Sequence, residues 1–156
     1  MEELSMIFLH IRTRFADAFF PRLSEWVAAA VICGCAWMLA VNHRLMASAP
    51  KPFQLMLDVA TQPTWAKVCL FLGVARIVIL FINGAWRRSP HARSMMATLS
   101  CFLWMQIVLS FSATLGLSVV CFAGFLVMDF LNIIRAARDA RTVDDAYAGS
   151  RKSGVA

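Results

Sequence analysis

The chain has 156 residues, of which 60% are hydrophobic and only 15% are charged. A soluble domain keeps about a quarter of its residues charged, so the composition excludes an ordinary soluble enzyme or binding module. The net charge of +6 is weak support for a nucleic-acid partner, because basic residues in a membrane protein first determine topology. The run from Ser94 to Met128 has 35 residues without a charge, whereas about 20 apolar residues cross a bilayer. The chain is therefore predicted to be an all-α integral membrane protein.

Residues 1–22 are predicted to form an amphipathic helix at the membrane interface. Apolar side chains recur at helical spacing over residues 4–20, while Arg12, Arg14 and Asp17 fall mostly on the other side. The segment is too charged to span, and it suits a helix in the cytoplasmic interface. An extension that packs on the bundle fits the same pattern. We expect no cleaved signal peptide, because two glutamates follow the initial methionine and no small-residue cleavage site follows a basic segment.

Four apolar segments predict a bundle of transmembrane helices within residues 23–135, at about 23–41, 65–85, 95–111 and 117–134. The last two come from the uncharged run, which as one helix would be about 50 Å long against a hydrocarbon core of about 30 Å. This run is therefore expected to fold back within 110–117. The loop at 42–64 contains a helical spacing of apolar residues that predicts a short helix on the outer surface. Residues 136–156 are predicted to be a polar cytoplasmic tail whose last eight or so residues are disordered.

Small residues in the spans suggest close packing. The first span contains Ala28, Ala29, Ala30 and Gly34, which would let a neighbouring helix approach closely. All five cysteines lie inside apolar segments, and we expect them to be small buried hydrophobic residues rather than disulfide partners.

Basic residues predict the orientation of the bundle. With four spans, the two tails and the loop at 86–94 share one side, which holds eleven of the fifteen basic residues; three lie on the other side and Arg76 lies within the membrane. Because positive residues stay in the cytoplasm, both termini are expected inside. A single span over 95–134 would place the C-terminal basic cluster outside. The residues assigned to topology or to lipid headgroups are Arg87, Arg88, Arg93, Arg135 and Arg138.

Polar residues inside the spans are expected to gather. An arginine near the centre of a span costs about 2.5–3.5 kcal/mol on insertion scales, so Arg76 must face protein or water. Asp129 is its predicted partner, because both helices run inward and the two depths differ by about 7 Å at 1.5 Å per residue. The predicted intramembrane cluster comprises Arg76, Asn83, Gln106, Asp129 and Asn132. It is either the lining of a proton, ion or solute path or a neutral clasp that fixes helix packing; the scarcity of titratable groups favours the clasp.

Catalytic, cofactor and metal sites are not expected. His10, His43 and His91 lie at or outside the membrane edges, so no pair of histidines can ligate a haem between helices. No CxxC faces the periplasm, and no Gly-rich phosphate loop or HExxH is present. Glu25 lies at the start of the first span rather than in its middle, which argues against the glutamate-driven four-helix multidrug exporters. The sequence therefore predicts a protein that is not an enzyme.

Three stretches carry a resemblance to a known group of proteins. They are NGAWRRSPHAR at 83–93, SCFLWMQ at 100–106 and DFLNIIRAARDA at 129–140. Together they resemble small polytopic membrane proteins encoded by tailed phages and prophages of proteobacteria. The resemblance covers about half of the chain and implies a bacterial inner membrane, but it carries over no catalytic or binding residue, because those proteins are uncharacterised.

Two classes of function are open at this point. The first is a holin-like protein that permeabilises the membrane in host lysis, supported by small size, several spans, a charged C-terminal tail and the resemblance. A central arginine and a fourth span count against it. The second is a non-catalytic interaction subunit, such as a superinfection-exclusion factor or an assembly partner, supported by the neutral Arg76–Asp129 pair. A small transporter is the third and least favoured hypothesis. The expected partners are the lipid bilayer and either further copies of the chain or another membrane protein.

Overall fold

The computed structural model of the protein describes residues 22–85, 90–114 and 116–153, and every secondary-structure element in this part is helical. The elements are α2 (Leu23–Val41), α3 (Leu45–Ser48), α4 (Pro50–Val59), α5 (Gln62–Ala85), α6 (Pro90–Ser112) and α7 (Leu117–Ser153). The predicted N-terminal amphipathic helix falls on residues 1–21, which lie outside the described part of the chain.

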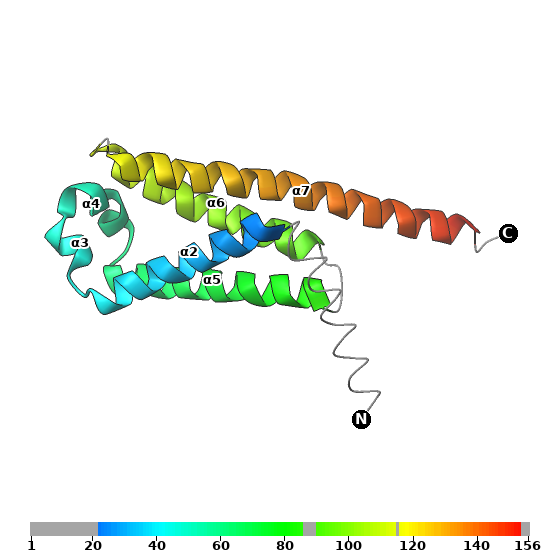
Figure 1. Cartoon of the computed structure of the whole chain (residues 1–156), viewed down its shortest axis with the longest axis horizontal. Helices are drawn as coiled ribbons and strands as arrows, with labels where there is room; N and C mark the ends of the chain where they lie inside the picture. The colour runs from blue at the N-terminus through cyan, green and yellow to red at the C-terminus, as the bar shows by residue number, and fades with distance from the viewer. Residues whose placement is uncertain (1–21, 86–89, 115, 154–156) are drawn as a thin grey trace, which may run out of the picture.

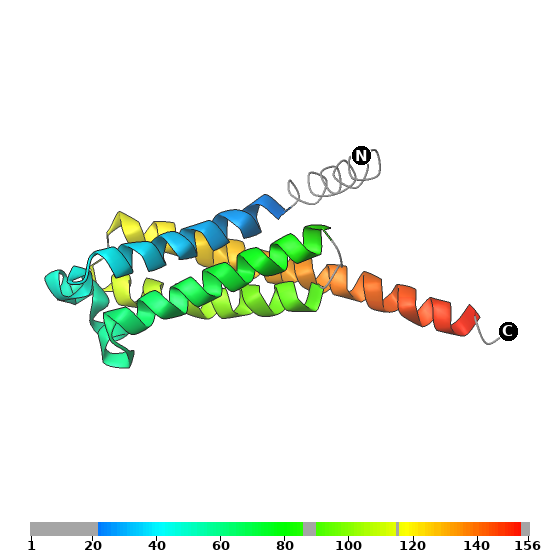
Figure 2. The same cartoon turned by 90° about the horizontal axis from the view of Figure 1, so that it is seen from below.

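Four of these helices, α2, α5, α6 and α7, are long and apolar enough to cross a membrane. They lie side by side as an elongated bundle, seen in two views in Figures 1 and 2. Large apolar side chains cover the outside of the bundle; Trp37 is 70% exposed and Phe71 is 74% exposed. A continuous apolar surface of this kind suits lipid and not water. The predicted class, a four-helix integral membrane bundle, is confirmed.

The bundle is built from two closely packed helix pairs. α2 packs against α5 and α6 packs against α7, while contacts between the two pairs are fewer. The backbones of the first pair meet at Gly73, where a β-carbon would lie 2.5 Å from the Cys33 Sγ and 3.1 Å from the Cys33 amide nitrogen. The predicted close approach to the first span therefore involves Ala29 and Cys33. Ala30 and Gly34 are exposed instead.

Helix ends differ from the prediction where the prediction relied on polarity. α6 begins at Pro90 rather than near residue 95, because proline is well suited to the first turn of a helix. α7 has 37 residues, a length of about 55 Å, and it extends past the ends of the other helices (Figure 1). The expected disorder of the last eight or so residues is thus wrong as far as Ser153, whereas the polar cytoplasmic tail stays a prediction. No proline interrupts this stretch, and its alanines and arginines are good helix formers.

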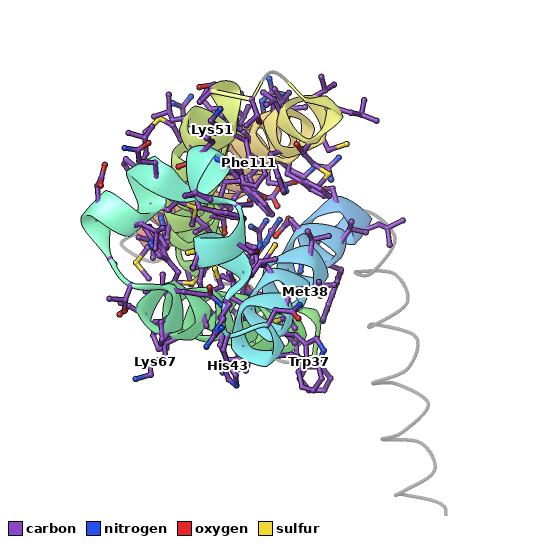
Figure 3. All side chains as sticks on the ribbon, turned by 90° about the vertical axis from the view of Figure 1, so that its left-hand side faces the viewer. Trp37, Met38, His43, Lys51, Lys67 and Phe111 are labelled. Atoms are coloured by element: carbon purple, nitrogen blue, oxygen red, sulfur yellow. The ribbon has the colours of Figure 1, made fainter. Side chains whose placement is uncertain are left out.

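The end of the bundle where α2 ends and α5 begins is closed by the short helices α3 and α4, which confirms that the 42–64 loop contains a helix. The Gln62 amide nitrogen donates to the Leu39 carbonyl at 2.8 Å and the Gln62 amide oxygen accepts from the Met46 amide at 2.9 Å. The rings of Phe53 and Phe111 meet edge to face at 5.0 Å between centroids. Figure 3 looks onto this end, where Trp37, His43 and Lys67 point outward from the bundle.

The cysteines do not share one environment. Cys69 is buried, Cys33, Cys35 and Cys101 are half-buried, and Cys121 is exposed on α7. The expectation that all five are buried is therefore wrong, most clearly for Cys121. Lipid tails are as apolar as a protein interior, so an apolar residue in a span need not be covered by protein.

Candidate functional site: a buried polar network

The centre of the bundle holds an arginine–carboxylate pair between α5 and α7. Arg76 Nη1 lies 2.7 Å from Asp129 Oδ2, and Arg76 Nη2 lies 2.5 Å from Asp129 Oδ1. Both side chains are buried, at 3% and 0% exposure. The contact is bidentate, the geometry in which the two planar groups match best. Arg76 and Asp129 thus lie together, as their depths predicted.

Further donors complete the environment of the Asp129 carboxylate. The Trp104 indole nitrogen donates to Oδ2 at 3.0 Å, and the Asn132 amide nitrogen donates to Oδ1 at 3.1 Å. With the two arginine bonds, the carboxylate accepts four hydrogen bonds, which is about its full capacity. The Trp104 ring also stacks on Phe125 at 5.0 Å between centroids, so one side of the pair is covered by aromatic rings.

The polar network reaches all four spans. Arg76 Nη1 also donates to the Ser100 hydroxyl on α6 at 2.7 Å. On the other side of the pair, the Ser24 hydroxyl on α2 donates to the Asn132 amide oxygen at 2.8 Å. Since contacts between the two helix pairs are fewer than those within them, these hydrogen bonds are a main part of what joins the pairs. We call this group of residues, Ser24, Arg76, Ser100, Trp104, Asp129 and Asn132, the central clasp.

A second ion-pair group lies toward the end of the bundle where α2 and α6 begin. Arg93 on α6 binds both carboxylate oxygens of Glu25 on α2, with the Nε to Oε2 distance at 3.1 Å. It also donates to Asp139 on α7 at 2.9 Å. Arg93 and Glu25 are buried, whereas the Asp139 side chain is 48% exposed. On α6, Arg93 is seven residues from Ser100, so this end clasp of Glu25, Arg93 and Asp139 lies about 10 Å from the central clasp.

Two residues of the predicted cluster lie elsewhere. Gln106 donates to the Leu55 carbonyl on α4 at 3.2 Å; it follows Trp104 by two residues, about 200° around the helix, so it faces away from Asp129. The Asn83 amide donates to the Ile79 carbonyl of its own helix at 2.8 Å. It shares the face of Arg76 but lies seven residues, about 10 Å, farther along. The prediction is wrong for Gln106 because equal depth does not fix the rotation of a helix, and for Asn83 because it lies two turns along α5 from Arg76.

The residues assigned to topology or to lipid headgroups also divide. Arg93 is buried in the end clasp and is 4% exposed, so a headgroup contact is wrong for this residue, while its topology role stays a prediction; it lies inside α6 because this helix begins five residues earlier than predicted. Arg135 and Arg138 are exposed on α7. Arg87 and Arg88 lie outside the described residues.

Sequence reasoning missed several members of both clasps. Ser24, Ser100 and Trp104 are not charged, and nothing in one sequence separates them from lipid-facing residues of the same types. A weak signal existed for Ser100 and Trp104, which are four residues apart and so share a helix face. Glu25 was identified as an interfacial charge, but its partner Arg93 is 68 positions away.

The arrangement is suited to holding helices together. The clasp carboxylate has no free acceptor position, and its arginine is bound to a carboxylate and a hydroxyl. Among the described residues, no group of three or more His, Cys, Asp and Glu side chains is placed to hold a metal ion. The buried Ser110 hydroxyl has no hydrogen-bond partner within the described part of the chain, but it stands alone on α6. The geometry thus favours the clasp over the path.

Comparisons of the chain with protein families, with curated proteins and with solved structures find no match.

Proposed function

We propose that the protein is a non-catalytic interaction subunit of a membrane assembly. The observation that carries this proposal is the saturation of Asp129, whose buried carboxylate is fully engaged by Arg76, Trp104 and Asn132. Paths for protons or ions are marked by several ionisable side chains that form relays or face a water-filled cavity. A neutral pair with every acceptor occupied instead keeps one helix arrangement, which is what a fixed binding surface requires.

The proposed location is the cytoplasmic membrane of a bacterium, with both termini inside. The eleven-to-three distribution of basic residues supports this orientation through the positive-inside rule. The start of α2, the end of α5, the start of α6 and the extension of α7 share one end of the bundle (Figures 1 and 2), as alternating spans require. The resemblance to phage and prophage membrane proteins supports the bacterial membrane.

Crosslinking in bacterial membranes tests the proposal directly. The tagged chain is crosslinked in the cells that naturally encode it, extracted in detergent and purified. We expect one defined membrane protein to be recovered in fixed proportion, and expect the Arg76→Ala variant to lose this partner together with its own accumulation. Purification of a stable monomer with no crosslinked partner would overturn the proposal.

The holin-like and transporter hypotheses predict different results from the same variants. A holin-like protein should collapse the membrane potential abruptly on induction and release a co-expressed endolysin, whereas an interaction subunit should permit continued growth. A transporter should lose flux in Arg76→Ala without losing protein level. If the original protein shows no flux and Arg76→Ala lowers the protein level, the result supports the interaction subunit.

A further inference from the structure

α7 differs from the other spans in how little of it the rest of the chain covers. Only 11% of the residues in its most apolar stretch are buried, against 33% to 39% in the other three candidate spans. The exposed face also includes Cys121 and Phe130, and six of its residues form a strip with alternating steps of three and four positions: Leu117, Val120, Gly124, Val127, Leu131 and Ile134. We call this strip the α7 seam. Steps of three and four repeat every seven residues, the spacing of helices that pack along one another.

Gly124 lies in the middle of the seam and faces open space. A β-carbon added there would meet no heavy atom within 4 Å, so the fold of this chain does not explain the glycine. Small residues at the centre of an exposed strip let a second transmembrane helix approach closely. α2 has a comparable strip with Gly34, and lipid alone can cover either of them. Within the described part of the chain, α7 is the span whose strip continues beyond its apolar stretch.

The α7 seam continues past the membrane with charged residues in the same steps. About 20 residues cross the hydrocarbon core, which brings α7 to residue 136, and the next seam positions are Arg138, Arg141 and Asp145, all exposed. At the opposite end of the bundle the strip of α2 stops with the helix at Val41, and the chain before residue 22 lies outside the described residues. The seam is therefore apolar over the thickness of the hydrocarbon core and then carries two positive residues, Arg138 and Arg141, followed by one negative residue, Asp145.

This charge order indicates which kind of partner fits. In a parallel two-fold dimer that packs α7 on α7, seam residues lie near the symmetry axis and face their own copies, so Arg138 and Arg141 would meet like charges. A sheet of anionic headgroups suits the arginines but repels Asp145. A helix of another protein that runs parallel to α7, with two acidic residues and then a basic residue at its facing positions, satisfies all three.

We propose that the α7 seam binds a single transmembrane helix of another protein whose cytoplasmic continuation carries acidic residues opposite Arg138 and Arg141. The proposal deepens the proposed function, because it names the surface and the chemistry of the partner, and it rests on that function. Gly124 lets the partner helix approach closely, and the charges fix the axial register between the two helices.

A designed peptide tests the seam on the full chain. The protein, with a photo-reactive amino acid in place of Val127, is reconstituted in phosphatidylcholine vesicles with an apolar 20-residue helix followed by Glu, Glu and Lys at seam spacing. A second peptide carries Lys, Lys and Glu. We expect the acidic-first peptide to crosslink about tenfold more and expect Arg138→Glu with Arg141→Glu to reverse the preference. Equal crosslinking of both peptides would overturn the proposal.

Matched glycine variants separate packing from general lipid contact. Gly124→Leu is expected to lower the crosslinking roughly fivefold, while Gly34→Leu, at the equally open glycine of α2, leaves it unchanged. Equal losses in both variants would contradict the seam. Loss of the peptide preference in vesicles that contain phosphatidylglycerol would assign the arginines to headgroups and would also count against it.

The same photo-reactive position distinguishes failure of the seam from failure of the proposed function. In native membranes, the photo-reactive amino acid is placed at Val127 or, as a comparison, at Val27 on α2. A defined partner that crosslinks from position 27 but not from position 127 would support the proposed interaction subunit and overturn the proposed seam. The absence of a partner from both positions would overturn the proposed function as well.

Discussion

The two clasps use the same chemistry at different depths. In the central clasp, Asp129 is 0% exposed and accepts four hydrogen bonds from protein donors. In the end clasp, Arg93 divides its bonds between the buried Glu25 and Asp139, whose side chain is 48% exposed. A charge that loses its partner near the end of the bundle can recruit water, whereas one at the centre cannot. The clasp whose side chains are more deeply buried should therefore contribute more to the free energy of unfolding.

The largest effect is expected from Asp129→Ala. The substitution leaves the Arg76 guanidinium buried without its carboxylate, which costs about 3–5 kcal/mol when one member of a buried pair is removed. Titration of the purified protein from mild detergent into sodium dodecyl sulfate measures the free energy of unfolding. Asp58→Ala, at an exposed aspartate of α4, is the matched control; an equal loss in both variants would contradict the central role of the clasp.

Replacing both charged residues should restore much of this loss. In the double variant Arg76→Met with Asp129→Leu no charge remains buried in the central clasp, and such replacements are often neutral or stabilising by about 1–4 kcal/mol relative to the ion pair. The charge exchange Arg76→Asp with Asp129→Arg should recover less, because the Trp104 and Asn132 donors would then face a guanidinium. The same unfolding titration ranks the two double variants. A better recovery by the exchange would show that the surrounding donors do not matter.

An intermediate effect is expected from Glu25→Ala in the end clasp. Arg93 keeps its contact with Asp139, so the loss is that of hydrogen bonds to a charged group, about 1.5–3 kcal/mol. Measured against Asp129→Ala in one titration, the value tests the difference between the clasps. If Glu25→Ala proves as damaging as Asp129→Ala, enclosure does not govern the contribution.

The smallest effect is expected from Asp139→Ala. Its carboxylate is half-exposed, and ion pairs of this kind contribute about 0–1 kcal/mol. The unfolding free energy should fall within this range and should depend on salt concentration, whereas the loss in Asp129→Ala should not. A salt-independent loss of several kcal/mol would place Asp139 among the buried partners.

Depth along the helix was predictable from the sequence, and rotation about the helix axis was not. Counting residues from the basic ends placed Arg76 and Asp129 at compatible levels, and the structure brings them together. The same counting placed Gln106 beside them, although it faces α4. The rotation of α6 depends on how Ser100 and Trp104 pack against other helices, and this information lies in contacts between distant segments.

Helix continuity was the other feature that hydropathy could not supply. Hydropathy marks where a helix leaves the apolar phase, and it correctly divided the long uncharged run near 110–117. It says nothing about where hydrogen bonding of the backbone stops, so the helix beyond residue 134 was missed. The end clasp was missed for the same reason, because Arg93 was assigned to a loop and Asp139 to a tail, while both belong to helices that pass one another.

The continuity of α7 has a mechanical consequence. About 17 residues, or about 25 Å of helix, extend beyond the hydrocarbon core, and neither a proline nor a break in the helix separates them from the span. The helix can thus tilt as one rigid rod that pivots at the Arg93 contact with Asp139. A change of about 10° in the tilt of the span would move its far end by about 4 Å, so an event inside the bilayer is felt at the C-terminal end of α7.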